Sequence, residues 1–322
     1  MTTPCSLRSL PPGGANEVSL GLSSQAAGPA PARIAVIGIG NMGWPIAQRL
    51  ADCGYTPVVR DIDPAREALA RAQGLEVAAS AAAAAQGAAA VIIAVIDAAQ
   101  TEIALFGDAG AVRTLTAGAC VLLCPTIAPA DTEAFAARLA AHGVGCLDAP
   151  MSGGPVRARS GTMSLMVAGD RALVARHRGL LAAIASPVFE VGSRAGDGAR
   201  TKLVNNLLAA INLAGAAEAL ALAARAGLDP AITLAVIEQS SGQSWIGSER
   251  LQRALVGDLA PRAHMTLLAK DSKLALELAR SARADVAIGA AAASRFSAAC
   301  ESGLASADDA ALYAWLRDLP AG

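Results

Sequence analysis

Lysine is scarce in this chain, and the position of one lysine suits proton transfer. Lysine and arginine together number 26, but only Lys202, Lys270 and Lys273 are lysines. Residues 203–217, which follow Lys202 directly, carry no charge, so they are expected to form a largely buried helix. Burial lowers the pKa of an amine toward neutrality, whereas an arginine stays protonated. The sequence therefore predicts that Lys202 exchanges a proton; the alternative is a lysine that extends from a helix end into solvent.

Asn206 lies one helical turn beyond Lys202 and is predicted to face the same way. Residues four apart on a helix are neighbours on its surface. The amide of Asn206 could therefore hold either the lysine amine or a substrate. Asn205 is rotated by about 100° around the helix and is expected to pack elsewhere.

A glycine-rich turn near residue 40 has the spacing of a dinucleotide-binding site. It follows a strand expected over 34–37 and precedes a helix expected over 44–53. In such a unit the glycines allow a tight turn, close approach of the backbone to a pyrophosphate and close helix packing. The helix N-terminus attracts the phosphates. This spacing also arises by chance in a chain with 31 glycines, so the order of the elements carries the prediction. The residues of the turn are Gly38, Ile39, Gly40, Asn41, Met42 and Gly43.

Asp61 ends the next expected strand, at a position suited to the adenosine ribose of the cofactor. A carboxylate about 20 residues beyond the glycine turn accepts hydrogen bonds from the ribose 2′-hydroxyl and repels a 2′-phosphate. The residue after it is Ile62 rather than an arginine, although Arg60 and Arg66 are near. NAD is therefore favoured as the cofactor, with NADP as the alternative.

The alternation of short apolar runs and Ala/Leu-rich helical segments predicts the fold class. We expect an α/β Rossmann domain with a doubly wound, mostly parallel sheet over 32–196. An all-α domain is expected over 197–322, joined by a long helix from Asp197 to Ala226. The expected strands are 34–37, 57–61, 91–96, 121–124, 145–148, 164–167 and 188–191.

Composition favours a cytoplasmic protein with a small-molecule partner. The net charge of −1, without a basic cluster, argues against a nucleic-acid partner. Residues 77–96 carry no charge over a length that could span a bilayer, but they are expected to form an Ala-rich helix and a buried strand, so no membrane partner is expected. Residues 1–31 are expected to be either a disordered leader or the result of a mis-assigned start. The six cysteines lack the spacing of a metal site and are expected to be buried free thiols.

Other common proton donors for hydride transfer do not fit the sequence. The Tyr-x-x-x-Lys pair of short-chain dehydrogenases is excluded, because Val59 and Arg317 follow Tyr55 and Tyr313 at the lysine position. The cysteines and histidines do not form a zinc-ligand pattern, so no metal is expected. The histidines are expected at helix ends or on the surface.

Several segments together resemble one family of enzymes. They occur in order over about residues 33–316, and they resemble the 3-hydroxyisobutyrate dehydrogenase family of β-hydroxyacid dehydrogenases. That family includes tartronate semialdehyde reductases and L-threonate dehydrogenases. The matching segments are Asn41-Met42-Gly43 in the glycine turn, residues 148–154 (Asp-Ala-Pro-Met-Ser-Gly-Gly), residues 161–164 (Gly-Thr-Met-Ser), the pair Lys202 and Asn206, and Lys270-Asp271.

The resemblance implies roles for the residues on the substrate side. Lys202 would be the general acid and base, and Asn206 would orient the substrate. Ser152, Gly153 and Gly154 would bind the substrate carboxylate, since a turn of this composition forms an anion nest. The substrate would lie between the two domains.

On the cofactor side, the resemblance implies contacts from Thr126 and from Lys270 near the nicotinamide ribose, with Asp271 supporting Lys270. Lys273 has no match in the family and is expected to be a solvated charge. Residues 95–97 read Val-Ile-Asp where many members of the family carry Leu-Pro-Asn.

The resemblance implies hydride transfer between a β-hydroxyacid and NAD by a homodimer or homotetramer. Segment 240–250, with Trp245 and Arg250, is most similar to the L-threonate branch, although Trp245 could equally fill the core of the helical domain. One alternative is a reductase of glyoxylate, succinic semialdehyde or tartronate semialdehyde. Another is a dinucleotide-binding protein without catalysis, against which the presence of both Lys202 and Asn206 argues. The related 6-phosphogluconate dehydrogenases have a larger helical domain.

Overall fold

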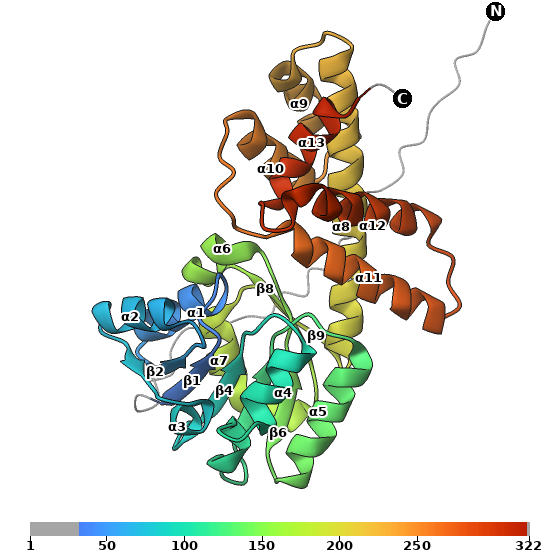
Figure 1. Ribbon diagram of the computed structural model, residues 1–322. Coiled ribbons are helices and arrows are strands. Elements are labelled where there is room, and N and C mark those ends of the chain that lie inside the picture. Colours follow the sequence, from blue (N-terminus) through green and yellow to red (C-terminus); the bar gives the residue numbers. More distant parts are fainter. Residues whose placement is uncertain (1–31, 321–322) are drawn as a thin grey trace, which may run out of the picture. The chain divides into compact units, whose positions relative to one another are not determined.

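A nine-stranded sheet organises the first half of the protein (Figure 1). The computed structural model describes residues 32–320, so the leader expected over 1–31 lies outside the described residues. The strand order is β3-β2-β1-β4-β5-β6-β8-β7, and β9 pairs with β8. The strands are β1 (Arg33–Ile37), β2 (Thr56–Arg60), β3 (Glu76–Val77), β4 (Ala90–Ile93), β5 (Cys120–Leu123), β6 (Gly145–Asp148), β7 (Met151–Ser152), β8 (Ser164–Ala168) and β9 (Val188–Gly192).

The strand order of the sheet changes direction at β1. The chain first steps outward through β2 and β3, then returns to the other side of β1 and continues through β4, β5 and β6. These strands are all parallel to their neighbours. Ligands of doubly wound sheets bind at such a switch point, beyond the carboxyl ends of the strands. The glycine turn follows β1 directly and lies at this edge.

Helices cover both faces of the sheet, as the alternation of side chains along a buried strand requires. Ile34 and Val36 of β1 belong to one apolar cluster, which α1, α2, α6 and α7 complete. Ala35 and Ile37 belong to a second cluster with α3, α4 and α5. The helices of this part are α1 (Gly43–Asp52), α2 (Pro64–Ala72), α3 (Ala81–Ala85), α4 (Ala98–Phe106), η1 (Ala111–Arg113), α5 (Pro129–Ala141), α6 (Gly154–Ser160) and α7 (Arg171–Ile184).

The second half of the protein is helical and surrounds one long helix, α8. A third apolar cluster, which includes Leu213, Phe296 and Leu312, joins α8 to the helices that follow it. Fully burying side chains of this size stabilises the fold by about 1.5–3 kcal/mol each. The elements are α8 (Asp197–Arg225), α9 (Pro230–Glu238), α10 (Trp245–Leu255), α11 (Met265–Ser281), α12 (Ala287–Ala299), η2 (Cys300–Leu304), η3 (Asp309–Ala311) and α13 (Leu312–Asp318).

The predicted fold class is confirmed: a mostly parallel sheet with helices on both faces precedes a helical region. The seven expected strands are all present, although the strand expected over 91–96 ends at Ile93. The two-residue strands β3 and β7 were not expected, and β8 runs antiparallel to β6 and β7. All described residues belong to one compact unit, so the predicted boundary near residue 196 stays a prediction.

Two expectations about burial are wrong in part. Cys120 and Cys124 are buried, and burial raises the pKa of the Cys120 thiol to about 12, but Cys53 is exposed at the end of α1. The long helix α8 is also less buried than expected, since Val204 and Leu208 are 64% and 57% exposed. The uncharged segment 77–96 forms α3 and β4, as expected.

One helix in the described chain, α8, is long and apolar enough to cross a membrane. A single helix of this kind is weak evidence, because the core helix of a soluble protein passes the same test. The contacts of α8 with α10, α11, α12 and α13 favour the role of a core helix.

Candidate active site

Lys202 lies in the second turn of α8 and is 8% exposed. Burial lowers the pKa of its amine to about 8; the negative charge of Asp271 acts in the opposite direction, and the positive charge of Lys270 acts with burial. An amine with a pKa in this range can both release and accept a proton near neutral pH, as a general acid or base must.

Asn206 and Asp271 connect α8 to α11 beside Lys202. The Asn206 Nδ2 donates a hydrogen bond to the Asp271 Oδ2 over 2.6 Å. Both residues are buried, at 8% and 6% exposure. This bond fixes the Asn206 amide. Its Oδ1 accepts one hydrogen bond, from the Asn205 Nδ2, and can accept a second from a ligand. Asn205 itself is exposed.

Lys270 links this network to the sheet. Its Nζ lies 2.8 Å from the Asp271 Oδ1 and donates to the backbone oxygen of Thr126 over 2.5 Å. Thr126 follows β5 at the carboxyl edge of the sheet. The structure therefore brings together four residues that the sequence singled out, together with Asp271.

Asp148, which the sequence reasoning did not assign a role, fixes the start of α8. It ends β6 and is 2% exposed, and its Oδ2 accepts hydrogen bonds from the backbone N–H groups of Gly196 (2.8 Å) and Ala199 (3.0 Å). These donors would otherwise have no partner within the helix. Burial raises the pKa of Asp148 to about 6, and the backbone donors oppose this rise. A buried aspartate at the end of a strand was the signal available in the sequence.

The glycine turn has the geometry of a phosphate cradle. Gly38 has a φ of +87°, which strains residues with a side chain, and its N–H donates to the Arg60 oxygen of β2. A Cβ added at Gly43 would lie 1.8 Å from the Gly38 oxygen, so α1 can begin here only with glycine. Met42, at the N-cap of α1, supplies no side-chain acceptor to the helix. The Trp44 N–H donates to the Gly40 oxygen and Pro45 has no N–H, so the first turn of α1 leaves the Gly43 N–H available to an anion.

Asp61 is tied to this turn. Its Oδ2 accepts from the Ile39 N–H over 2.7 Å, and its Oδ1 accepts from the Asp63 N–H over 2.9 Å. Arg66 also reaches the turn, through a hydrogen bond to the Ile39 oxygen. Arg60 is engaged by Glu67 instead. A buried carboxylate therefore lies beside the glycine turn, and its contact with the ribose stays a prediction.

Ser152, Gly153 and Gly154 form the connection between β7 and α6. Gly153 and Gly154 have φ values of +132° and +74°, so this turn also depends on glycine. Within the described residues no hydrogen bond joins the turn to Lys202. The link is indirect, through Asp148, which precedes the turn in sequence and holds the start of α8.

In the segment that resembles the L-threonate branch, the Trp245 side chain is exposed and the Arg250 side chain is in ion pairs. Trp245 begins α10 and is 56% exposed, so it does not fill the core. Arg250 is paired with Glu249 and with Asp309 and is largely buried. Its charge is therefore already compensated, whereas the indole ring can contact a ligand.

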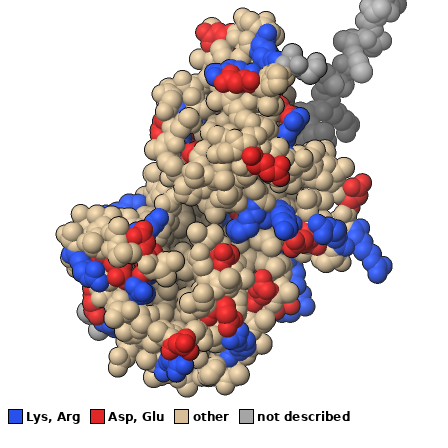
Figure 2. All heavy atoms as spheres, viewed as in Figure 1, with Lys and Arg blue, Asp and Glu red and all other residues tan. Residues whose placement is uncertain are grey.

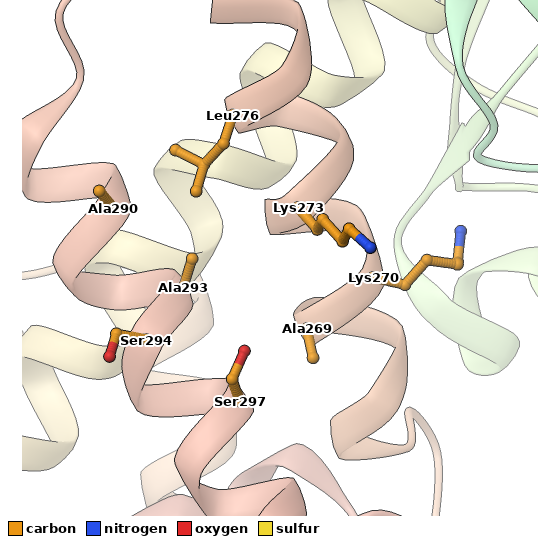
Figure 3. Close-up of a pocket in the computed structure, with 8 residues that line it drawn as sticks. All are labelled: Ala269, Lys270, Lys273, Leu276, Ala290, Ala293, Ser294 and Ser297. Carbon is orange, nitrogen blue, oxygen red and sulfur yellow. The ribbon is translucent and has the colours of Figure 1, made fainter. Parts of the chain in front are cut away.

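Lys273 lies outside this group of residues. It lines an open cavity of about 470 Å³ between α11 and α12, among small residues that include Ala290, Ala293 and Ser297 (Figure 3). Lys270 lines the same cavity with its stem, but Figure 3 shows its amine directed away from α12. Neither Lys202 nor Asn206 contributes to this cavity.

The surface offers no basic footprint on the face shown in Figure 2, where Lys and Arg side chains lie among Asp and Glu side chains. Among residues 32–320, no group of three His, Cys, Asp or Glu side chains could hold a metal ion. His142 follows α5 and His264 precedes α11, as expected, but the expectation is wrong for His177, which lies within α7 and is half-buried.

Two family models match the chain in succession. The NAD-binding domain of 6-phosphogluconate dehydrogenase matches residues 33–192. The NAD-binding domain of NADP-dependent 3-hydroxyisobutyrate dehydrogenase matches residues 196–316.

Curated relatives and solved structures agree with these matches. An L-threonate dehydrogenase of Cupriavidus necator is 37% identical over 280 residues, which cover 87% of this chain and 94% of the relative. A 3-hydroxyisobutyrate dehydrogenase of Pseudomonas aeruginosa is 36% identical over 272 residues, covering 82% and 91%. The crystal structure of a 3-hydroxyisobutyrate dehydrogenase from Salmonella typhimurium superposes with a TM-score of 0.82 at 34% identity, covering 88% and 99%.

Proposed function

Because the chain belongs to the 3-hydroxyisobutyrate dehydrogenase family, and is thus an NAD(P)-dependent hydroxyacid dehydrogenase, we propose that Lys202 is the acid and base of its reaction. One observation carries this proposal: Lys202 is buried beside Asn206 and Asp271. The burial lowers the pKa of its amine to about 8, although the charge of Asp271 opposes this shift. The three groups come from α8 and α11, two helices that pack against each other.

Each residue has a defined part in the reaction. In oxidation, the hydroxyl of the β-hydroxyacid gives its proton to the neutral amine of Lys202, and the carbon that carries the hydroxyl loses a hydride. The bound nicotinamide supplies the hydride acceptor. Asn206, held by Asp271, accepts a hydrogen bond from the substrate through its amide oxygen. In reduction, the Lys202 ammonium returns the proton to the carbonyl oxygen.

The residues of the turn after β1 fit the cofactor. A Cβ at Gly38 or Gly43 would collide with the backbone of Ala94 or of Gly38, so this tight turn requires glycine at both positions, and the Gly43 N–H at the start of α1 can donate to a pyrophosphate. We assign Gly38 to Gly43 to the pyrophosphate, Asp61 to the adenosine ribose, and Thr126 and Lys270 to the nicotinamide side. NAD is preferred to NADP, because the Asp61 carboxylate would repel a 2′-phosphate and Arg60 is already paired with Glu67.

The substrate carboxylate is assigned to Ser152, Gly153 and Gly154, where two left-handed glycines turn the backbone into an anion nest. Trp245 is a candidate contact for the rest of the substrate, since its ring is exposed at the start of α10. A threonate-like acid is the first choice, because two of the proteins most similar to this one are named L-threonate dehydrogenase.

We propose that residues 32–196 form the NAD-binding domain, which also holds the substrate carboxylate. Residues 197–322 would form the helical domain, which carries Lys202, Lys270, the other substrate contacts and the dimer contacts. The two family models meet between residues 192 and 196, which supports this boundary. We further propose that the enzyme acts in the cytoplasm as a homodimer or homotetramer.

A screen of cofactor reduction tests the proposed function. The purified enzyme is mixed with NAD or NADP and with threonate, 3-hydroxyisobutyrate, glycerate and 3-hydroxypropionate in turn, and formation of NADH or NADPH is followed at 340 nm. We expect the highest kcat/KM with NAD and threonate. A reductase of semialdehydes would instead turn over glyoxylate or succinic semialdehyde with NADH and show little oxidation of any of the four acids.

A further inference from the structure

The segment between α10 and α11, residues 256–264, is held in place by one buried carboxylate. Asp308 is 0% exposed, and its Oδ2 accepts hydrogen bonds from the backbone N–H groups of Arg262 (2.7 Å) and Ala263 (3.2 Å). Its Oδ1 accepts from the Arg253 guanidinium over 3.1 Å and from the Ala310 N–H over 3.0 Å. Both oxygens of Asp308 are therefore occupied by donors.

Asp308 stays ionised in this environment. Burial by itself would raise the pKa of the carboxyl, but the backbone donors and the Arg253 charge outweigh burial and hold it below its usual range. Arg253 in turn donates to the Ala260 oxygen over 2.9 Å, so it holds the same segment at a second point. Charge-assisted hydrogen bonds of this kind are about twice as strong as neutral ones.

The opposite side of this segment contacts the glycine turn. The Arg262 oxygen accepts a hydrogen bond from the Asn41 Nδ2 over 3.2 Å. Asn41 is an exposed residue of the turn, so little else in the described chain restrains its side chain. The Arg262 guanidinium donates hydrogen bonds to the carboxylates of Asp258 and Glu249. The backbone of the segment, rather than its charge, therefore meets the turn.

We propose that Asp308 is a positioning residue for cofactor binding: it holds residues 260–263 so that the Arg262 carbonyl fixes Asn41 and, through it, the glycine turn. This inference rests on the proposed placement of the cofactor on that turn. Fixing the turn in advance lowers the cost of ordering it when the pyrophosphate binds. Because binding and ordering are linked reciprocally, a bound cofactor also stabilises the 256–264 segment.

Variants at two ends of this chain of contacts test the proposal. In Asp308→Asn, one oxygen becomes an NH2 group that faces another donor, so the segment loosens. Asp309→Asn is the matched control, because Asp309 is adjacent and 1% exposed but its carboxylate binds Arg250 rather than the segment. NADH affinity is measured by fluorescence titration of the wild-type enzyme, Asp308→Asn, Asp309→Asn, Asn41→Ala and the double variant Asn41→Ala/Asp308→Asn.

We expect Asp308→Asn to weaken NADH binding about tenfold, as the loss of one charged hydrogen bond predicts. The KM for the hydroxyacid should change far less, and Asp309→Asn should bind NADH as the wild type does. The effects of Asn41→Ala and Asp308→Asn should not multiply, since both break the same path. Independent, multiplying effects, or equal effects of the two aspartate variants, would overturn the proposal.

Hydrogen exchange gives a second test that does not require Asp308→Asn to fold. In the wild type, NADH should slow exchange at the Arg262 and Ala263 amides by about tenfold, and Asn41→Ala should remove this effect. Unchanged exchange on NADH binding would also overturn the proposal. If the wild type bound no NADH, the proposed function would fail instead, which separates the two failures.

Discussion

At the scale of single residues, Lys202 is under opposing influences that set its proton affinity. Burial lowers the pKa of the amine and the Asp271 carboxylate raises it, with a net value of about 8. A guanidinium in the same place would stay charged throughout this range. The choice of lysine at this position, in a chain that otherwise uses arginine, thus has a chemical reason.

The pKa of Lys202 predicts how the rate depends on pH. Oxidation needs the neutral amine, so kcat/KM for the hydroxyacid should rise as pH increases through about 8; reduction needs the ammonium and should fall over the same range. In Asp271→Asn the midpoint should move to lower pH, because the carboxylate that favours the charged amine is gone. Steady-state rates in both directions from pH 6 to 10 measure this. Parallel profiles in the two directions would contradict the assignment.

At the scale of elements, α8 determines where Lys202, the proposed acid and base, lies. Its first turn is capped by Asp148 from the sheet, its second turn carries Lys202, and its later turns pack into the helical core with Leu213. The face with Lys202 and Asn206 is therefore placed by contacts at both ends of the helix.

Replacement of the cap should loosen this placement. Asp148→Asn removes a charged acceptor from two buried N–H groups, so we expect a loss of about 1–3 kcal/mol in the free energy of unfolding. Asp285 is exposed, so the free energy of unfolding of Asp285→Asn should lie within about 0.5 kcal/mol of the wild-type value. Urea denaturation followed by circular dichroism measures both. Equal stability of the two variants would show that Asp148 does not anchor α8.

The sequence predicts elements better than it predicts the contacts between them. The buried parallel strands are recognisable because β1, β4 and β5 are continuous apolar runs bounded by turns. The strands β3 and β7 have only two residues and exist through their neighbours, so no local pattern reveals them. The roles of Asp148 and Asp308 were also hidden, because their partners are backbone N–H groups whose position depends on the tertiary fold.

The site was predictable to a similar extent. Lys202, Asn206 and the glycine turn stand out by residue type and spacing, and the resemblance to a family supplied Ser152 and Thr126. The exposed ring of Trp245 and the pairing of Arg250 with Asp309 depend on packing that spacing does not encode.

At the scale of the whole molecule, the helical half leaves apolar surface uncovered. Val204, Leu208 and Leu222 of α8 are 64%, 57% and 70% exposed, and Ile232 and Val236 of α9 are 66% and 59% exposed. Apolar residues scattered singly are ordinary, but a series on two consecutive helices favours contact with another subunit.

The proposed homo-oligomer predicts a change in mass on disruption of this surface. The wild type should sediment as a dimer or tetramer, and Leu208→Glu should shift it toward smaller species, because burying a charge in an apolar interface is costly. Leu69→Glu, on exposed α2 in the other half, should leave the mass unchanged. Sedimentation equilibrium distinguishes these cases; a monomeric wild type would refute the proposed assembly.

Exchange of Lys202 for arginine tests the central claim most directly, because it preserves the charge and removes the ability to titrate. Single-turnover reduction of NAD by the preferred hydroxyacid should slow by about 10²–10⁴-fold in Lys202→Arg. Lys273→Arg is the matched control, since Lys273 is exposed and outside the site, and it should react at the wild-type rate. Near-normal turnover by Lys202→Arg, with NADH binding intact, would contradict the assignment of Lys202 as the acid and base.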